Sequence, residues 1–284
     1  MQHVEFFDKV HFEKNYRRYP APPGLSSFID FFWETDFESL WKQYPKGFSD
    51  VLFPNTGYTY LINLGTPFIM EVGEKKFNMK TDGFIPRHEA LECYHRPGNQ
   101  LFGIKFKISP VLFEKKINFS EYKGYIFPLS YLMESSVIKN VKRCGSFPER
   151  VKILCTYFDK ILEKYSGSLE PVDIVTRILA QCDKTNDFTV PIEDFAHQYG
   201  ISSRTLQRYF EITTSLSSKK ALQILRIRKA VEHVVNDPRT FDSSRYGYYD
   251  QSHFYKHLVR FLQKKTLRKL RPHLLLLRSL HGSV

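Results

Sequence analysis

The stretch Gly247-Tyr248-Tyr249-Asp250-Gln251-Ser252-His253-Phe254, followed by Leu258 and Phe261, decides the fold of the C-terminal third of this chain. A glycine turn leads to a short polar cap, and a helix follows in which basic residues lie between apolar ones. An earlier stretch, Gly200-Ile201-Ser202-Ser203-Arg204-Thr205-Leu206 with Phe210 after it, has the same form. Each pattern is typical of a helix-turn-helix, and the repetition predicts two reading units for duplex DNA on one chain.

The residues around these stretches predict where the helices begin and end. Ser202 and Asp250 stand where N-caps belong, and Asp237-Pro238 ends a long amphipathic helix that connects the two units. A short helix is expected before Gly247. Helices are predicted at residues 192–199, 203–210, 219–236 and 251–262. The connecting helix is expected to turn three basic residues away from its apolar stripe: Arg226, Arg228 and Lys229.

The charge of the chain is uneven. The formal net charge is +12, and nearly all of the excess lies after residue 190. A basic segment of this kind neutralises phosphates and releases counterions when it binds nucleic acid. A solvated basic surface or a membrane-facing patch would explain the charge alone, but the helical repeat in the same segment favours nucleic acid.

The preceding part of the chain has a different pattern. Short aromatic and β-branched runs between turn residues predict strands at 58–62, 67–72 and 101–106, in a sandwich or small barrel. One early helix is expected at 25–33. From about residue 130 the apolar spacing becomes helical. We therefore expect an α+β protein with a barrel-like (cupin-like) domain and trailing helices at 1–182, a polar linker from 183 to 190, and an all-α tandem helix-turn-helix domain within 183–284.

The C-terminal hundred residues resemble the DNA-binding domain of AraC-type transcriptional regulators. The matching residues are Ile192–Ala196, Gly200–Ser202, Leu206–Phe210, Arg226, Ala230 and, most specifically, Gly247–Phe254. The N-terminal half resembles, more loosely, the β-rich sensor domain of such proteins, at Phe32-Trp33, Gly57, Leu61–Gly65 and Gly103–Phe106. The resemblance implies a cytoplasmic activator or repressor that responds to a small effector, often as a homodimer, and that contacts RNA polymerase if it activates.

The outward faces of the two recognition helices supply the candidate DNA contacts. Arg and Gln side chains form paired hydrogen bonds with guanine and adenine edges, and Lys and Arg also anchor phosphates. The predicted DNA-binding residues are Ser203, Arg204, Gln207, Arg208, Gln251, Ser252, Tyr255, Lys256 and Arg260.

The chain departs from the family pattern after each recognition helix and before Gly247. The family usually has Gly and then Pro where this chain has Ser215 and Ser218, and again where it has Gln263 and Thr266. Asp242-Ser243 stands where the family usually has an Ile-Ala pair, and a polar residue facing the core costs about 1–3 kcal/mol without a partner. A ligand-binding or interaction protein with a degenerate second unit is therefore the alternative hypothesis.

Catalytic and cofactor motifs are not found in the sequence. His253 and His257 are spaced to chelate a metal, but phosphate contact or packing is the favoured interpretation. His88 and His95 are the central candidates for a cupin-type metal site, and no His-x-His pair accompanies them. The sequence predicts no enzyme, no metal and no cofactor. Four scattered cysteines, no apolar run of bilayer length and no secretory start favour a reduced, cytoplasmic protein without a membrane segment.

Overall fold

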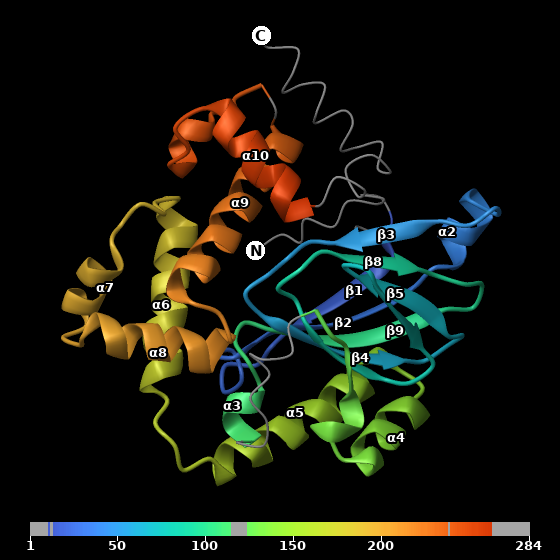
Figure 1. Ribbon diagram of the computed structural model, residues 1–284. Helices are drawn as coiled ribbons and strands as arrows, with labels where there is room; N and C mark the ends of the chain where they lie inside the picture. The colour runs from blue at the N-terminus through green and yellow to red at the C-terminus, as the bar shows by residue number, and fades with distance from the viewer. Residues whose placement is uncertain (1–10, 12–13, 115–123, 238, 263–284) are drawn as a thin grey trace.

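The computed structural model describes residues 11, 14–114, 124–237 and 239–262. Gln263 and Thr266, and the chain start used in the localisation argument, lie outside the described residues. The N-terminal part contains two antiparallel sheets, and helices follow it to the end of the described chain (Figure 1). The predicted α+β architecture, with a β-rich first part and a helical second part, is confirmed.

The larger sheet has six strands in the order β1-β2-β9-β4-β7-β10. Its members are β1 (Tyr16–Pro20), β2 (Ile29–Asp36), β4 (Tyr58–Asn63), β7 (Gly83–Pro86), β9 (Gln100–Phe106) and β10 (Phe127–Pro128). The smaller sheet has the order β3-β8-β5-β6. Its members are β3 (Ser49–Leu52), β5 (Phe68–Val72), β6 (Lys75–Met79) and β8 (Leu91–Tyr94), and the short helix α2 (Glu38–Gln43) precedes β3.

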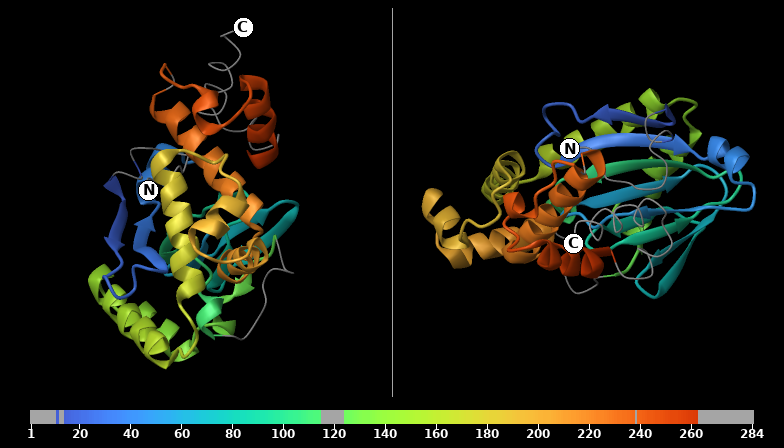
Figure 2. Two further views of the ribbon diagram at one scale, coloured as in Figure 1. Left: turned by 90° about the vertical axis from the view of Figure 1, so that its left-hand side faces the viewer. Right: turned by 90° about the horizontal axis from the view of Figure 1, so that it is seen from above.

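The larger sheet is covered on both faces. One face packs against the smaller sheet, through Trp33, Leu61 and Met70 among others. The other packs against α4 (Ser135–Arg143) and α5 (Phe147–Lys164), with Phe158 among the rings of the sheet (Figures 1 and 2). Because both faces are buried, every residue of β4 is buried, and the strand shows no alternation of polar and apolar residues.

The predicted strands at 58–62, 67–72 and 101–106 are confirmed as β4, β5 and β9. The helix expected at 25–33 is wrong, because Ile29–Asp36 forms strand β2. Leu25, Phe28, Ile29 and Phe32 have helical spacing, yet all four pack in the core beneath the sheet from a turn and a strand. The backbone hydrogen bonds of β2 with β1 and β9 decide the conformation of this segment. The spacing of its apolar residues does not decide it, because these residues can be buried in a helix or in a strand.

The helical part has its own core. It is built by α6 (Glu170–Thr185), α7 (Ile192–Gln198), α8 (Ser203–Thr214), α9 (Ser218–Asn236), the 3₁₀ turn η3 (Ser243–Tyr246) and α10 (Gln251–Leu262). The linker expected at 183–190 is partly wrong, because α6 continues to Thr185 and Phe188 is buried in this core. The division at residues 182 and 183 stays a prediction, and this point lies inside α6.

Candidate nucleic-acid interface

The first helix-turn-helix unit consists of α7, the turn at Gly200 and α8. Gly200 has φ +65°, in the left-handed region that glycine adopts without strain. The hydroxyl of Ser202 accepts a hydrogen bond from the backbone N–H of Thr205 at 3.1 Å, so the predicted N-cap is confirmed. Leu206 and Phe210 are fully buried in the helical core, so the opposite face of α8 is turned outward.

The second unit consists of η3, the turn at Gly247 and α10. The carboxylate of Asp250 accepts a hydrogen bond from the N–H of His253 at 2.6 Å, which confirms the second predicted N-cap. Phe254 and Leu258 are fully buried. The first helix of this unit is reduced to a single 3₁₀ turn, and the side chain of Asp242 caps it by accepting from the N–H of Ser244.

The segment before Gly247 is therefore a 3₁₀ turn and not a regular helix. Ser243 is buried, and Tyr246 packs beside Phe241 and His233 in place of the missing aliphatic pair. Its hydroxyl lies 2.9 Å from Nδ1 of His233. Aromatic packing and short-range capping hold this segment against α9. A regular short helix was expected here.

Helix α9 joins the two units, with α8 near one end and α10 near the other (Figure 1). The expectation that three basic side chains of α9 are turned away from its apolar stripe is wrong for Arg228. Arg228 is buried and donates a hydrogen bond to the carbonyl of Pro54, in the N-terminal part, at 2.8 Å. The guanidinium of Arg226 lies 3.8 Å from the ring centroid of Tyr248, a cation–π contact with the second unit.

The second unit also contains a half-buried histidine, His257. Its Nδ1 lies 2.7 Å from the hydroxyl of Tyr248. Burial is the main reason that the pKa of His257 is lowered to about 4, and the positive charges of Arg226 and Lys220 contribute to the same shift. Arg226, Tyr248 and His257 thus form one packed group between α9 and α10.

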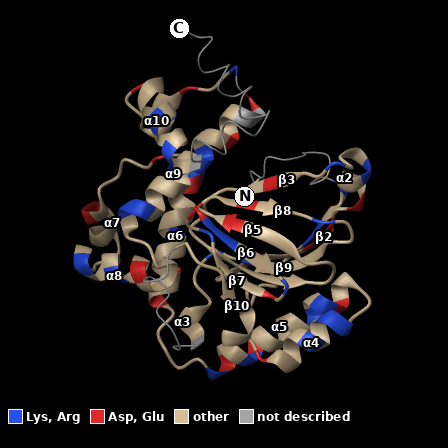
Figure 3. Ribbon diagram, turned by 45° about the vertical axis from the view of Figure 1, so that its right-hand side comes forward, with Lys and Arg blue, Asp and Glu red and all other residues tan. Residues whose placement is uncertain are grey.

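The predicted DNA-binding side chains gather on the two outward helix faces. Most of them are exposed: Arg204, Arg208, Gln251, Ser252, Lys256 and Arg260. Ser203, Gln207 and Tyr255 are partly exposed. Basic residues on α8, α9 and α10 are visible in Figure 3. The first turn of α8 contains no acidic residue, so a phosphate at this end would meet no opposing carboxylate within that turn.

Gln207 differs from its neighbours because both ends of its amide are bonded within the protein. The amide nitrogen donates to Glu211 at 2.8 Å, and the amide oxygen accepts from the hydroxyl of Ser218 at 2.7 Å and from its N–H at 3.2 Å. The side chain thus joins α8 to the first turn of α9. A contact with a base would have to replace these bonds.

The far end of α8 contacts the N-terminal part, which sequence reasoning missed. The hydroxyl of Tyr58 donates to the carbonyl of Thr214 at 3.1 Å, and the N–H of Ser109 donates to the carbonyl of Thr213 at 2.5 Å. Phe53 packs with Phe261 of α10, ring centroids 6.1 Å apart. No local pattern marks these residues, because each contact joins positions far apart in the sequence.

A cleft of about 470 Å³ lies between the two parts of the molecule. Residues of the turn before β2, of β9 and of helices α6 and α9 line it, with Lys105, Lys107 and Arg177 as its basic side chains and Asp30 and Asp183 as its acidic ones. Lys105 is buried, with its ammonium 2.8 Å from the carboxylate of Asp30. Burial lowers the pKa of Lys105 to about 8, while the charge of Asp30 opposes that shift.

No helix among the described residues combines the length and the apolar character that crossing a bilayer requires.

No family model and no curated protein matches this chain. Among solved structures, it is similar to ToxT from Vibrio cholerae in a P21 crystal form, with 10% identity, 87% of this chain and 95% of that chain covered, and a TM-score of 0.42. ToxT from Vibrio cholerae O395 gives 10% identity, coverage of 76% and 89%, and a TM-score of 0.42. The chain is also similar to unsaturated fatty acid-bound wild-type ToxT from Vibrio cholerae strain SCE256. The identity is 9%, 76% of this chain and 91% of that chain are covered, and the TM-score is 0.40. The likeness extends over most of the chain.

Proposed function

We propose that this chain binds a specific sequence of duplex DNA and regulates transcription. One observation carries the proposal: two short helices with side-chain N-caps stand at the two ends of α9, and each has an exposed polar and basic face. A helix held in this way by a buried apolar face is the element that enters the major groove in helix-turn-helix proteins. Two such helices on one chain would read successive grooves ~34 Å apart without a two-fold symmetric site.

The exposed side chains divide into two roles in this proposal. Arg204, Arg208 and Gln251 read base edges, because guanidinium and amide groups make paired hydrogen bonds with guanine or adenine, worth about 1–3 kcal/mol of discrimination each. Ser252, Lys256 and Arg260 position the second helix, largely through phosphates. In this proposal Ser203 and Gln207, which are partly exposed, help to position α8, and Tyr255 helps to position α10.

We also propose that a small effector with a negative charge binds in the cleft between the two parts. The volume of the cleft falls within the range of small-molecule sites. A ligand carboxylate near Lys105 would replace Asp30 as the partner of a buried ammonium. Because α6 and α9 line the cleft, such a ligand would alter how the helical part rests on the sheet. In this proposal the boundary of the DNA-binding domain lies between α5 and α6, since Ile174 and Ile178 of α6 pack in the helical core.

The test is selection of bound sequences from a random duplex pool by the full chain. The expected result is a recurrent site with two conserved half-sites about one helical turn apart. A salt titration then compares the selected site with random DNA. A specific binder keeps its preference as salt rises, whereas a merely basic surface loses affinity for both sequences together.

A second candidate function rests on the single 3₁₀ turn that replaces the first helix of the second unit. In that case α10 does not read DNA, and the chain is a ligand-binding or interaction protein with at most one working unit. Enrichment of a single half-site would assign reading to α8 alone. A pool without any recurrent sequence would refute the DNA-binding proposal.

A further inference from the structure

Three side chains that can bind a metal converge between the two sheets. Asp50 on β3, Cys93 on β8 and His95 just after β8 are all buried, and their ligand atoms lie within 4.8 Å of one another. Asp50 and Cys93 are direct partners in the antiparallel pair β3–β8. Cys93 and His95 are two positions apart, so an extended chain presents both side chains on the same face. Pairing and pleat together therefore bring the three donors to one point.

The orientation of the His95 ring is fixed by its second nitrogen. The amide of Asn99 donates to the carbonyl of Thr66 at 2.9 Å, which leaves its oxygen facing Nδ1 of His95 at 2.7 Å. Nδ1 therefore carries the hydrogen and donates it to Asn99. A metal-binding histidine is typically oriented in this way, with the ring N–H that does not face the metal bonded to a protein oxygen.

The other nitrogen, Nε2, lies 3.0 Å from a carboxylate oxygen of Asp50. Both atoms are of the kinds that bind Zn²⁺ in proteins. The ring is held in place by Phe37 and Phe68, whose centroids lie 3.6 and 5.3 Å from that of His95.

The space next to the three donors suits a fourth ligand. Asp50, Cys93 and His95 all line a cavity of about 40 Å³, which is large enough for one water molecule. Arg87 and Lys105 line the same cavity. The positive charges of Arg87 and Lys105 would oppose a bare cation. A carboxylate and a thiolate balance the charge of a dication, however. The two basic side chains then favour hydroxide or another small anion as the fourth ligand.

We infer that Asp50, Cys93 and His95 bind a divalent transition-metal ion of the zinc class. One oxygen, one sulfur and one nitrogen donor with one open position is a set that Zn²⁺ accepts in tetrahedral geometry, whereas Mg²⁺ and Ca²⁺ prefer oxygen alone. The ion ties β3 to β8 inside the β-rich part. This site is independent of the DNA-binding proposal, and the sequence signal for it is the Cys93-x-His95 spacing.

The experiment is titration of the full chain, purified metal-free under reducing conditions, with Co²⁺ as a spectroscopic probe. We expect one cobalt per chain, a thiolate-to-cobalt charge-transfer band, intense visible bands of tetrahedral cobalt, and loss of all of them when Zn²⁺ is added. Cys93→Ser should abolish the charge-transfer band. Asn99→Ala should weaken cobalt binding by about 10- to 100-fold, because the ring of His95 loses its orienting partner.

Cys182→Ser is the matched control, since Cys182 is also buried but lies in the helical core. It should bind cobalt as the natural chain does. Zn²⁺ should also raise the melting temperature of the natural chain and of Cys182→Ser, and leave that of Cys93→Ser unchanged. The proposal is overturned if the natural chain shows no charge-transfer band, or if the band survives Cys93→Ser. An unaltered melting temperature with Zn²⁺ would equally reduce the site to a His95–Asp50 ion pair.

Discussion

The hydroxyl of Tyr58 donates a hydrogen bond to the carbonyl oxygen of Thr214 at 3.1 Å, and so joins strand β4 to the last turn of α8. Tyr58 is fully buried, and burial raises its pKa far above the ordinary value, so the hydroxyl keeps its hydrogen. The last carbonyls of a helix have no partner within the helix, and here the N-terminal part supplies donors for two of them. The first candidate recognition helix is thus held by the β-rich part of the chain.

Tyr58→Phe removes this bond without changing the packing of the ring. We expect a loss of about 1 kcal/mol in the free energy of unfolding, because a buried carbonyl loses its donor. Hydrogen exchange should speed up at the amides of the last turn of α8. Tyr157→Phe is the control, since Tyr157 donates to the carbonyl of Leu132 within the N-terminal part. Equal effects of the two variants on α8 would contradict the role given to Tyr58.

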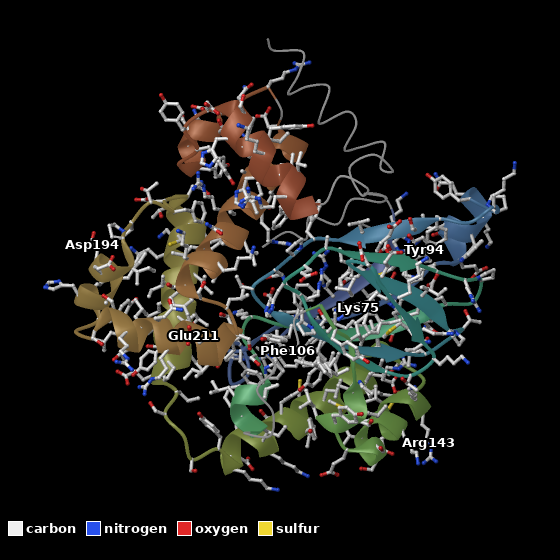
Figure 4. All side chains as sticks on the ribbon, viewed as in Figure 1. Lys75, Tyr94, Phe106, Arg143, Asp194 and Glu211 are labelled. Carbon is white, nitrogen blue, oxygen red and sulfur yellow. The ribbon has the colours of Figure 1, made fainter. Side chains whose placement is uncertain are left out.

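Arg208→Ala tests the proposed reading of bases by α8. The side chain is exposed, so its removal leaves the core intact. Affinity for the selected site should fall by more than about tenfold, with a smaller loss for random DNA, because a paired base contact carries sequence preference. Arg143→Ala is the matched control, since Arg143 is exposed on α4, remote from Glu211 of α8 (Figure 4). An unchanged site preference for Arg208→Ala would remove this residue from the reading set.

Substitution of Ser215 tests the left-handed backbone conformation at the end of α8. It is the C-cap residue, with φ +56° and ψ +22°, where the resembling family usually has glycine. A left-handed conformation costs a residue with a Cβ roughly 1 kcal/mol relative to glycine. Ser215→Gly should therefore be more stable than Ser215→Ala by about that amount in chemical denaturation. Both variants lack the hydroxyl, so the comparison isolates the backbone. Equal stabilities would show that the left-handed geometry is not retained.

His257 should make the second unit sensitive to acid. Its pKa is about 4 when folded, below the ordinary histidine value, so the unfolded chain binds more protons between about pH 6.5 and 4. The contribution of the neutral His257 ring to the free energy of unfolding is fully present above that pH window and is lost as the pH falls through it. His257→Gln should lose less stability than the natural chain from about pH 7 to about pH 4 in denaturant titrations. His197→Gln, at an exposed position on α7, should behave as the natural chain does.

The helices of the C-terminal part were largely predictable because their signals are local. The predicted bounds 192–199, 219–236 and 251–262 differ from α7, α9 and α10 by at most one residue at either end. Caps and glycine turns act within a few residues, so Ser202 and Asp250 could be identified from the sequence. The prediction for α8 stopped four residues early, because Thr213 and Thr214 look polar in sequence but are buried against the N-terminal part.

The sequence by itself determined the repeated units, their caps, their apolar faces and the uneven charge, since each depends on residues close together in the chain. Only the tertiary structure decided that Ile29–Trp33 lies in a strand, that Arg228 contacts the N-terminal part, and that Gln207 is bonded to α9. It also brought Asp50 to Cys93 and His95. The physical reason is that strand pairing, burial on two faces and contacts between distant segments depend on residues far away in the chain. Local periodicity does not identify those residues.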